Sequence, residues 1–206
     1  MKHMGSLLWV KRLLWTLLAC ILMSTAMAAD KDPYAIVGDV TDALVGAARD
    51  FKADNDQAAF DKKVLMALEP VVAFDYIARV VMGDYYKGAT KEQQERFAAL
   101  FKANLVSTYA KGIATYADSN IKVMPAPAPV GDERRVTVDQ EVSHEGETHK
   151  LSYSMAKNKT GEWKLINLVL NGINLGRSFS SQFEQLAGKN GGDIDKVIAS
   201  WEAGEG

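Results

Sequence analysis

The side chains best suited to acid–base or metal chemistry flank one predicted turn. His144 and His149 lie on either side of Glu145-Gly146, and Glu147 is close by. Imidazole nitrogens and carboxylate oxygens are the ligands that zinc prefers, so this set would suit a metal ion held across a hairpin. A solvated polar turn is the commoner origin of such a pattern, and we favour it. We therefore expect neither a metal site nor a cofactor.

Two aspartates near apolar residues are the other candidates for catalysis. Asp75 and Asp84 could form a carboxylate pair in which one pKa is raised. The alternative is structural. Asp75 stands four residues before Arg79, which predicts an ion pair between them, and Asp84 falls at a predicted helix end, where polar groups serve as turn and cap residues. The sequence also lacks a Gly-x-Ser-x-Gly elbow, a phosphate-binding glycine loop and a His-Glu-x-x-His helix. This favours a binding protein that is not an enzyme, with a periplasmic hydrolase as the rival hypothesis.

The first residues predict export. An uncharged apolar run over residues 13–23 follows Lys2, Lys11 and Arg12, and Ala26-Met27-Ala28 comes after it. That order is typical of a secretory signal peptide, and cleavage is expected after Ala28. The alternative is an uncleaved anchor, but the run is shorter than the ~20 apolar residues that span a bilayer. We predict a signal peptide over residues 1–28 and a periplasmic protein of Gram-negative type.

Cys20 leaves one alternative for the N-terminus. Residues 17–20, Leu-Leu-Ala-Cys, are close to a lipoprotein processing box, which would leave an acylated Cys20 at the start of the mature chain. Cys20 is also the only cysteine of the sequence. Cleavage after Ala28 would remove it, and this would exclude disulfides, thiolate metal sites and a cysteine nucleophile.

Chain length and net charge further limit the kinds of protein that this sequence could encode. Residues 29–206 suit a single domain with a hydrophobic core. The sequence has 24 Lys plus Arg and 26 Asp plus Glu, and removing the three basic residues of the signal leaves 21 against 26, a net charge of −5. Nucleic acid is therefore not an expected partner, because it requires a basic surface.

Apolar spacing predicts the elements of the mature chain. Steps of three and four residues indicate helices over residues 33–55, 58–68, from Pro70 to Gly83, and 90–116, with two more over 177–187 and 193–201. After the connection at residues 124–129 the period changes to two, which predicts strands over residues 136–142, 151–155 and 163–170, with a short one at 121–124. The fold class is α+β, with helices packed on one face of a curved antiparallel sheet of about four strands.

Two stretches resemble the central signature of a known family. They are Phe74-Asp75-Tyr76-Ile77-Ala78-Arg79-Val80-Val81-Met82-Gly83 and Ala89-Thr90-Lys91-Glu92-Gln93-Gln94-Glu95-Arg96-Phe97. The similarity resumes at Trp163-Lys164-Leu165-Ile166-Asn167, Gly172-Ile173-Asn174-Leu175 and Ser181-Gln182-Phe183. In this order they resemble the MlaC family, also called the toluene-tolerance family.

The resemblance implies a monomeric periplasmic carrier of phospholipid. Its partners would be an outer-membrane lipoprotein–porin complex and an inner-membrane ABC transporter. A related branch is associated with hopanoid biosynthesis, so a hopanoid-associated lipid is the alternative cargo.

Such a carrier needs an apolar cavity. Exposing two acyl chains of about fifteen carbons to water costs on the order of 24 kcal/mol, at about 0.8 kcal/mol per methylene. We expect the sheet and the long helix to hold these chains between them. The side chains predicted to contact lipid come from the helices and from the sheet: Phe74, Ile77, Val81, Phe97, Phe101, Leu105, Tyr109, Tyr153, Leu168 and Leu170.

Overall fold

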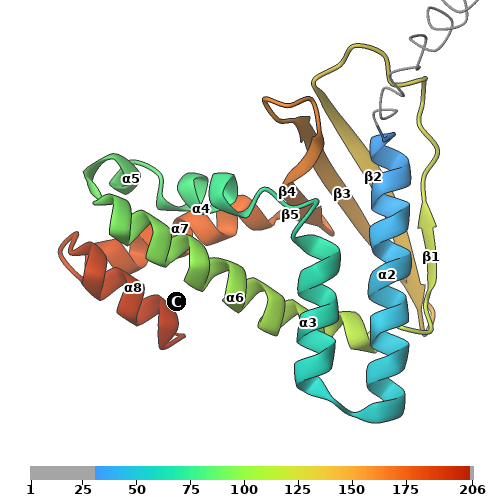
Figure 1. Ribbon diagram of the computed structural model, residues 1–206, viewed down its shortest axis with the longest axis horizontal. Coiled ribbons are helices and arrows are strands. Elements are labelled where there is room, and N and C mark those ends of the chain that lie inside the picture. Colours follow the sequence, from blue (N-terminus) through green and yellow to red (C-terminus); the bar gives the residue numbers. More distant parts are fainter. Residues whose placement is uncertain (1–30, 205–206) are drawn as a thin grey trace, which may run out of the picture. The chain divides into compact units, whose positions relative to one another are not determined.

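The computed structural model describes residues 31–204, except for the side chains of Tyr109 and Lys111. The predicted signal peptide and Cys20 lie outside this range. Within it, the chain runs through five helices, a sheet and two further helices (Figure 1). The elements are α2 (Pro33–Asp54), α3 (Gln57–Leu68), α4 (Phe74–Met82), α5 (Tyr85–Gly88), α6 (Lys91–Thr115), β1 (Asn120–Val123), β2 (Arg135–His144), β3 (Glu147–Lys157), β4 (Trp163–Leu170), β5 (Ile173–Asn174), α7 (Leu175–Lys189) and α8 (Ile194–Glu202). In this range, no helix is both long and apolar enough for a membrane span.

Local capping explains where the long helices begin. The Thr90 hydroxyl accepts the Gln93 backbone N–H at 3.2 Å, and the Gln93 side chain accepts the Thr90 N–H at 2.9 Å. This reciprocal pair satisfies two donors that the first turn of α6 would otherwise leave free. In α2, Pro33 occupies the first turn, where its missing N–H costs nothing. Both starts confirm the prediction from sequence.

Helix α4 begins later than the sequence predicted. After Pro70 the chain makes a turn and then a single bridge to β4, in which Leu165 donates its N–H to the Val71 carbonyl at 2.8 Å and accepts the Ala73 N–H at 3.0 Å. These bonds attach the segment to the edge of β4, so the helix starts only at Phe74. It ends at Gly83, whose φ of 54° favours a residue without a Cβ.

The five strands form an antiparallel meander in the order β1-β2-β3-β4-β5. Glu145 and Gly146 connect β2 to β3 with φ values of 49° and 88°, as a tight two-residue hairpin requires. Asn171 and Gly172 do the same between β4 and β5, with 49° and 82°. The two-residue β5 and the four-residue α5 were not predicted from the sequence.

The two faces of the sheet differ in polarity. On the outer face, Ser152 donates to Asp139 at 2.6 Å. The inner face carries apolar side chains, and Val37 of α2 packs against it. Its residues, placed by the strand register, are Val136, Val138, Gln140, Val142, Leu151, Tyr153, Met155, Leu165, Leu168 and Leu170. Helices on one face of an antiparallel sheet confirm the predicted α+β class.

Buried apolar side chains gather in three separate clusters. The helical cluster joins α4, the first half of α6, α7 and α8 around Phe97, Phe101 and Phe183. The α2–α3 cluster includes Phe60 and Val64 and extends to the second half of α6. The sheet cluster joins α2 to the inner face. Helix α6 therefore contributes to two clusters.

Candidate functional site

Four of the predicted lipid contacts are almost completely covered by protein. Phe74, Val81, Phe97 and Phe101 are only 7%, 1%, 0% and 1% exposed. The Phe97 ring meets Phe183 edge-on, with ring centroids 4.9 Å apart. Contacts of this kind stabilise the helical cluster. A lipid would reach Val81, Phe97 and Phe101 only if the helical cluster opened.

Five of the other predicted contacts, Tyr153 among them, are only half-buried. Ile77 and Leu105 lie at the margin of the helical cluster, and Leu168 and Leu170 lie on the inner face of β4. Tyr109 is in α6, but its side chain is outside the described part. The structure thus places the helix residues and the sheet residues in different apolar groups, and their contact with a shared ligand stays a prediction.

Half-buried apolar side chains on inward faces are the surface that a ligand could cover. Beyond the predicted residues they include Leu151, which pairs with Leu170 across the β3–β4 ladder. Ile113, Leu65 and Leu68 are half-buried at the margin of the α2–α3 cluster. Ligand sites are mostly lined by such side chains. In the sequence, Leu151 is two residues before Tyr153 on the same predicted strand, so both side chains point to one face. This alternation was the signal by which Leu151 could have been added to the predicted contacts.

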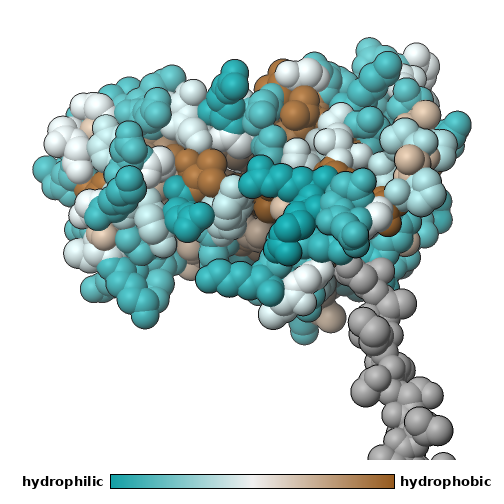
Figure 2. Space-filling model, turned by 90° about the horizontal axis from the view of Figure 1, so that it is seen from above, coloured by the Kyte–Doolittle hydropathy of each residue, from teal (hydrophilic) through white to brown (hydrophobic). Residues whose placement is uncertain are grey.

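Some apolar surface also reaches solvent. Figure 2 shows brown hydrophobic patches among the hydrophilic side chains of the face seen from above. Among the described residues, the most exposed large apolar side chains are Met66, Tyr76, Val80 and Ile173, at 65%, 37%, 45% and 59%. Tyr76 and Val80 lie on α4.

One polar network crosses the apolar inner face. The Gln140 amide is 3% exposed and donates to the Thr41 hydroxyl at 2.8 Å. The Tyr153 hydroxyl donates to Gln140 Oε1 at 2.8 Å. Burial raises the pKa of Tyr153 well above its ordinary value. The network fixes α2 on the sheet and keeps Tyr153 protonated as a donor.

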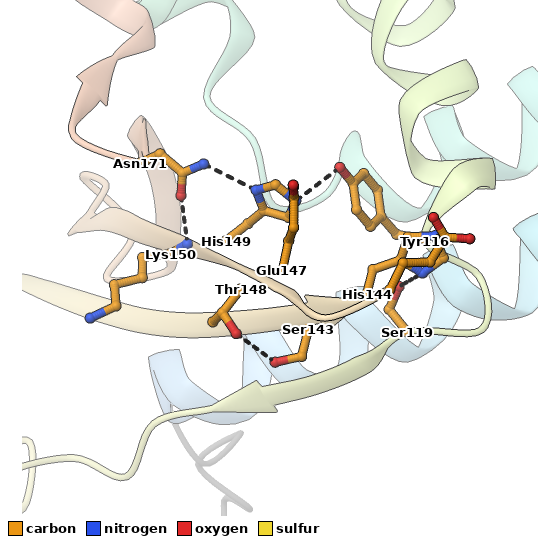
Figure 3. Close-up of polar contacts among 10 residues, drawn as sticks. Tyr116, Ser119, Ser143, His144, Glu147, Thr148, His149, Lys150 and Asn171 are labelled. Atoms are coloured by element: carbon orange, nitrogen blue, oxygen red, sulfur yellow. Dashed lines mark hydrogen bonds and ion pairs between the residues drawn. The ribbon is translucent and has the colours of Figure 1, made fainter.

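The two histidines do not form a freely solvated turn. Both are 24% exposed, and the Tyr116 ring at the end of α6 meets each edge-on, with centroids 5.3 Å from His144 and 5.4 Å from His149 (Figure 3). Tyr116 Oη lies 3.2 Å from His149 Nε2, and Ser119 Oγ lies 3.1 Å from His144 Nδ1. The expectation of a solvated turn was therefore wrong in part, since residues 145–148 are exposed but His144 and His149 are half-buried.

The predicted ion pair of Asp75 is replaced by another contact. Among the described residues no ion pair joins Asp75 to Arg79, and the guanidinium lies over the Tyr76 ring, 5.4 Å from its centroid. Asp75 and Asp84 are both exposed to solvent. In residues 31–204 no group of three or more histidine, cysteine, aspartate or glutamate side chains could hold a metal ion.

A pocket of ≈ 420 Å³ lies away from the predicted lipid contacts. It is bounded by the first turn of α2, the connection from β1 to β2, and the start of β2. Its lining includes Tyr34, Met124, Val130, Glu133, Val136 and Asp139.

Comparison with known proteins points to one family. A family model described as MlaC protein matches residues 38–203. A toluene tolerance protein of Pseudomonas putida is 36% identical over 203 residues, which cover 95% of this chain and 90% of that protein. The intermembrane phospholipid transport system binding protein MlaC of Haemophilus influenzae is 25% identical, over 94% of this chain and 91% of its own length.

A solved structure has the same fold. It is a phospholipid-binding protein from Ralstonia solanacearum, determined in complex with a phospholipid. It superimposes with a TM-score of 0.73 at 25% identity, covering 82% of this chain and 94% of the other.

Proposed function

Because the chain belongs to the MlaC family, we propose that it is a periplasmic carrier that holds a phospholipid between its sheet and its helices. The observation that supports this most directly is the inner face of β4. Its leucines lie inside the fold, yet protein side chains cover them only in part. A similar protein was solved in complex with a phospholipid, and the acyl chains of such a ligand would suit these partly uncovered side chains.

The proposed mature protein is residues 29–206, released by cleavage after Ala28. It would move as a monomer between an outer-membrane lipoprotein–porin complex and an inner-membrane ABC transporter. The carrier offsets the cost of moving acyl chains through water by covering them with apolar side chains. Such contacts are non-directional, and no reaction has to be catalysed for the lipid to be bound or released.

The polar groups of the site are consistent with a binding role. The ring nitrogens of His144 and His149 are engaged by Ser119, Tyr116 and Asn171. Asp75 and Asp84 are exposed and lie outside any described apolar cluster. We propose that none of the four takes part in catalysis, so replacing them should leave lipid transfer intact.

A bulky substitution on the inner face tests the proposal. Leu168→Trp places an indole where the acyl chains would lie, and overpacking of this kind costs about 1–3 kcal/mol. At about 1.4 kcal/mol per tenfold, this corresponds to a loss of about fivefold to 150-fold in lipid affinity. Val169→Trp is the matched control, because Val169 pairs with Ser152 and points to the outer face.

The measurement is native mass spectrometry of protein purified from the periplasm, with transfer of a fluorescent phospholipid between vesicles. We expect wild type and Val169→Trp to carry lipid, and Leu168→Trp to lose it. The mass of the bound species distinguishes a phospholipid from a hopanoid-associated lipid. A wild-type protein that carries no lipid and takes none from vesicles would overturn the proposal.

A further inference from the structure

The ladder between β1 and β2 stops before β2 ends. Its last bond is from the Met124 N–H to the Asp139 carbonyl, at 2.8 Å. The connection that follows contains Pro125, Pro127 and Pro129, which have no N–H and cannot continue a ladder. Strand β2 extends to Arg135, so its first residues run on beside the arching connection without pairing to it (Figure 1).

The edge of β2 that this leaves open carries backbone groups that no neighbouring strand pairs with. Asp139 directs its carbonyl toward β1, and alternation along a strand directs the N–H and C=O of Thr137 and Arg135 to the same edge. The Tyr34 hydroxyl donates to the Thr137 carbonyl at 3.2 Å. Within residues 31–204, the N–H groups of Thr137 and Arg135 have no hydrogen-bond partner. Unpaired edges of this kind are templates for another strand.

The ≈ 420 Å³ pocket lies along this edge and has a distinct chemistry. Tyr34, Met124, Val130 and Val136 supply apolar surface, Glu133 and Asp139 supply carboxylates, and no basic residue lines it.

The pocket carboxylates are fixed by local bonds. Glu133 accepts the Gly131 N–H at 2.7 Å, and Asp139 accepts the Ser152 hydroxyl at 2.6 Å. Burial, and then the charge of Asp139, raise the pKa of Tyr34, as expected in a negative field.

We propose that this pocket binds an extended segment of a partner protein, which adds to the open edge of β2 as a strand and places a lysine or arginine between Glu133 and Asp139. Backbone groups of Arg135 and Thr137 would supply the ladder, and the apolar wall would take the neighbouring side chain. The carboxylates disfavour a phosphate-bearing lipid at this place. The pocket shares Val136 with the inner face, but none of the predicted lipid contacts lines it, so the proposal does not rest on the proposed lipid cargo.

A designed peptide tests the site. The probe is an end-capped heptapeptide of alternating threonine and valine with one central lysine, labelled for fluorescence anisotropy, and its partner peptide has glutamate at the centre. We expect the lysine peptide to bind the purified protein and the glutamate peptide to bind more weakly. In amide spectra, the shifts induced by the lysine peptide should concentrate at Arg135 and Thr137.

Variants test the pocket carboxylates and the backbone groups of the β2 edge separately. Glu133→Gln and Asp139→Asn replace a carboxylate with a neutral amide of similar shape. Each should weaken binding of the lysine peptide by up to about fivefold, the upper end of the range for exposed ion pairs. Glu145→Gln with Glu147→Gln removes two charges at the far end of the same hairpin and should change nothing. Thr137→Pro removes an edge donor and should also weaken binding. The proposal is overturned if neither peptide binds at millimolar concentration, if both bind equally, or if the shifts lie elsewhere.

Discussion

Gln140 is the one polar side chain fully buried among the described residues, and it joins two elements. Its amide bonds both to Thr41 of α2 and to Tyr153 of β3, and Thr41 in turn donates to the Val37 carbonyl at 2.7 Å. A buried amide costs free energy unless it is bonded, whereas a bonded one selects a single arrangement of its neighbours. We infer that Gln140 sets how α2 lies on the sheet.

The contribution of the Tyr153 hydrogen bond to stability is limited to pH values at which the phenol keeps its proton. Since burial raises its pKa, the folded protein keeps the phenol proton at pH values where the unfolded chain, with a pKa near 10.0, releases it. The stabilisation is complete below pH 10.0 and is lost as pH rises above it. We expect the free energy of unfolding to fall more steeply above that pH in wild type than in Tyr153→Phe.

Urea unfolding between about pH 8 and pH 11, across the ordinary range for tyrosine, measures this dependence. Tyr153→Phe should be less stable at the lower pH by about 1–3 kcal/mol, because Gln140 Oε1 loses its donor. Tyr76→Phe, on an exposed part of α4, should follow wild type. Equal slopes for wild type and Tyr153→Phe would contradict the assignment.

At the scale of elements, Tyr116 attaches the β2–β3 hairpin to the end of α6. Lys150 donates its backbone N–H to Asn171 Oδ1 at 2.8 Å, which directs the Asn171 amide nitrogen to His149 Nδ1 at 3.0 Å. His149 Nδ1 is then an acceptor, so the neutral ring carries its proton on Nε2 and donates to Tyr116. The hairpin, α6 and the β4–β5 turn are thus joined by one set of bonds.

Replacing Tyr116 should loosen this junction. Two edge-on ring contacts and a hydrogen bond are lost in Tyr116→Leu, and we expect the free energy of unfolding to fall by about 2–4 kcal/mol. Tyr116→Phe keeps the ring contacts and should lose about 1 kcal/mol. Amide exchange at Ser143 and Thr148 should rise in the leucine variant. Tyr76→Leu is the control, and unchanged exchange at the hairpin would contradict the prediction.

Most elements could be predicted from the sequence because their signals are local. The capping box at Thr90 and the change of period after Pro129 depend on neighbouring residues only. The start of α4 could not be predicted, because the turn at Val71 is held by a tertiary bond from Leu165. Four residues in α5 and two in β5 are too few to show a period.

The lipid contacts could be predicted only in part. Phe101 and Leu105 are four residues apart on one side of α6, and the sequence treats them alike. The structure packs Phe101 inside the helical cluster and leaves Leu105 at its margin. Periodicity reports which side chains turn inward, but not whether they meet a neighbour or a ligand.

At the scale of the molecule, a lipid between the sheet and the helices would join apolar clusters that are otherwise separate. A ligand that binds only the folded state stabilises it by about 2.7 kcal/mol when present at a hundred times its Kd. For a chain of this size, that corresponds to about 5–10 °C in the melting midpoint. We expect removal of lipid with detergent to lower the midpoint by this amount, and added phospholipid to restore it.

Calorimetry of Leu168→Trp provides the comparison. If this variant cannot hold lipid, its melting midpoint should not respond to delipidation or to added phospholipid. A wild-type midpoint that is also indifferent to lipid would show that no cargo joins the clusters.

Helix α6 packs in both the helical cluster and the α2–α3 cluster, and this limits where residues can be inserted or deleted. One residue inserted in the middle of α6 would rotate everything after it by about 100°, so Val106 and Ala110 would leave the α2–α3 cluster while Phe97 and Phe101 stayed in theirs. A residue inserted among the prolines before β2 would only lengthen a loop. Insertions and deletions that evolution accepts should therefore collect in that connection and spare the helix.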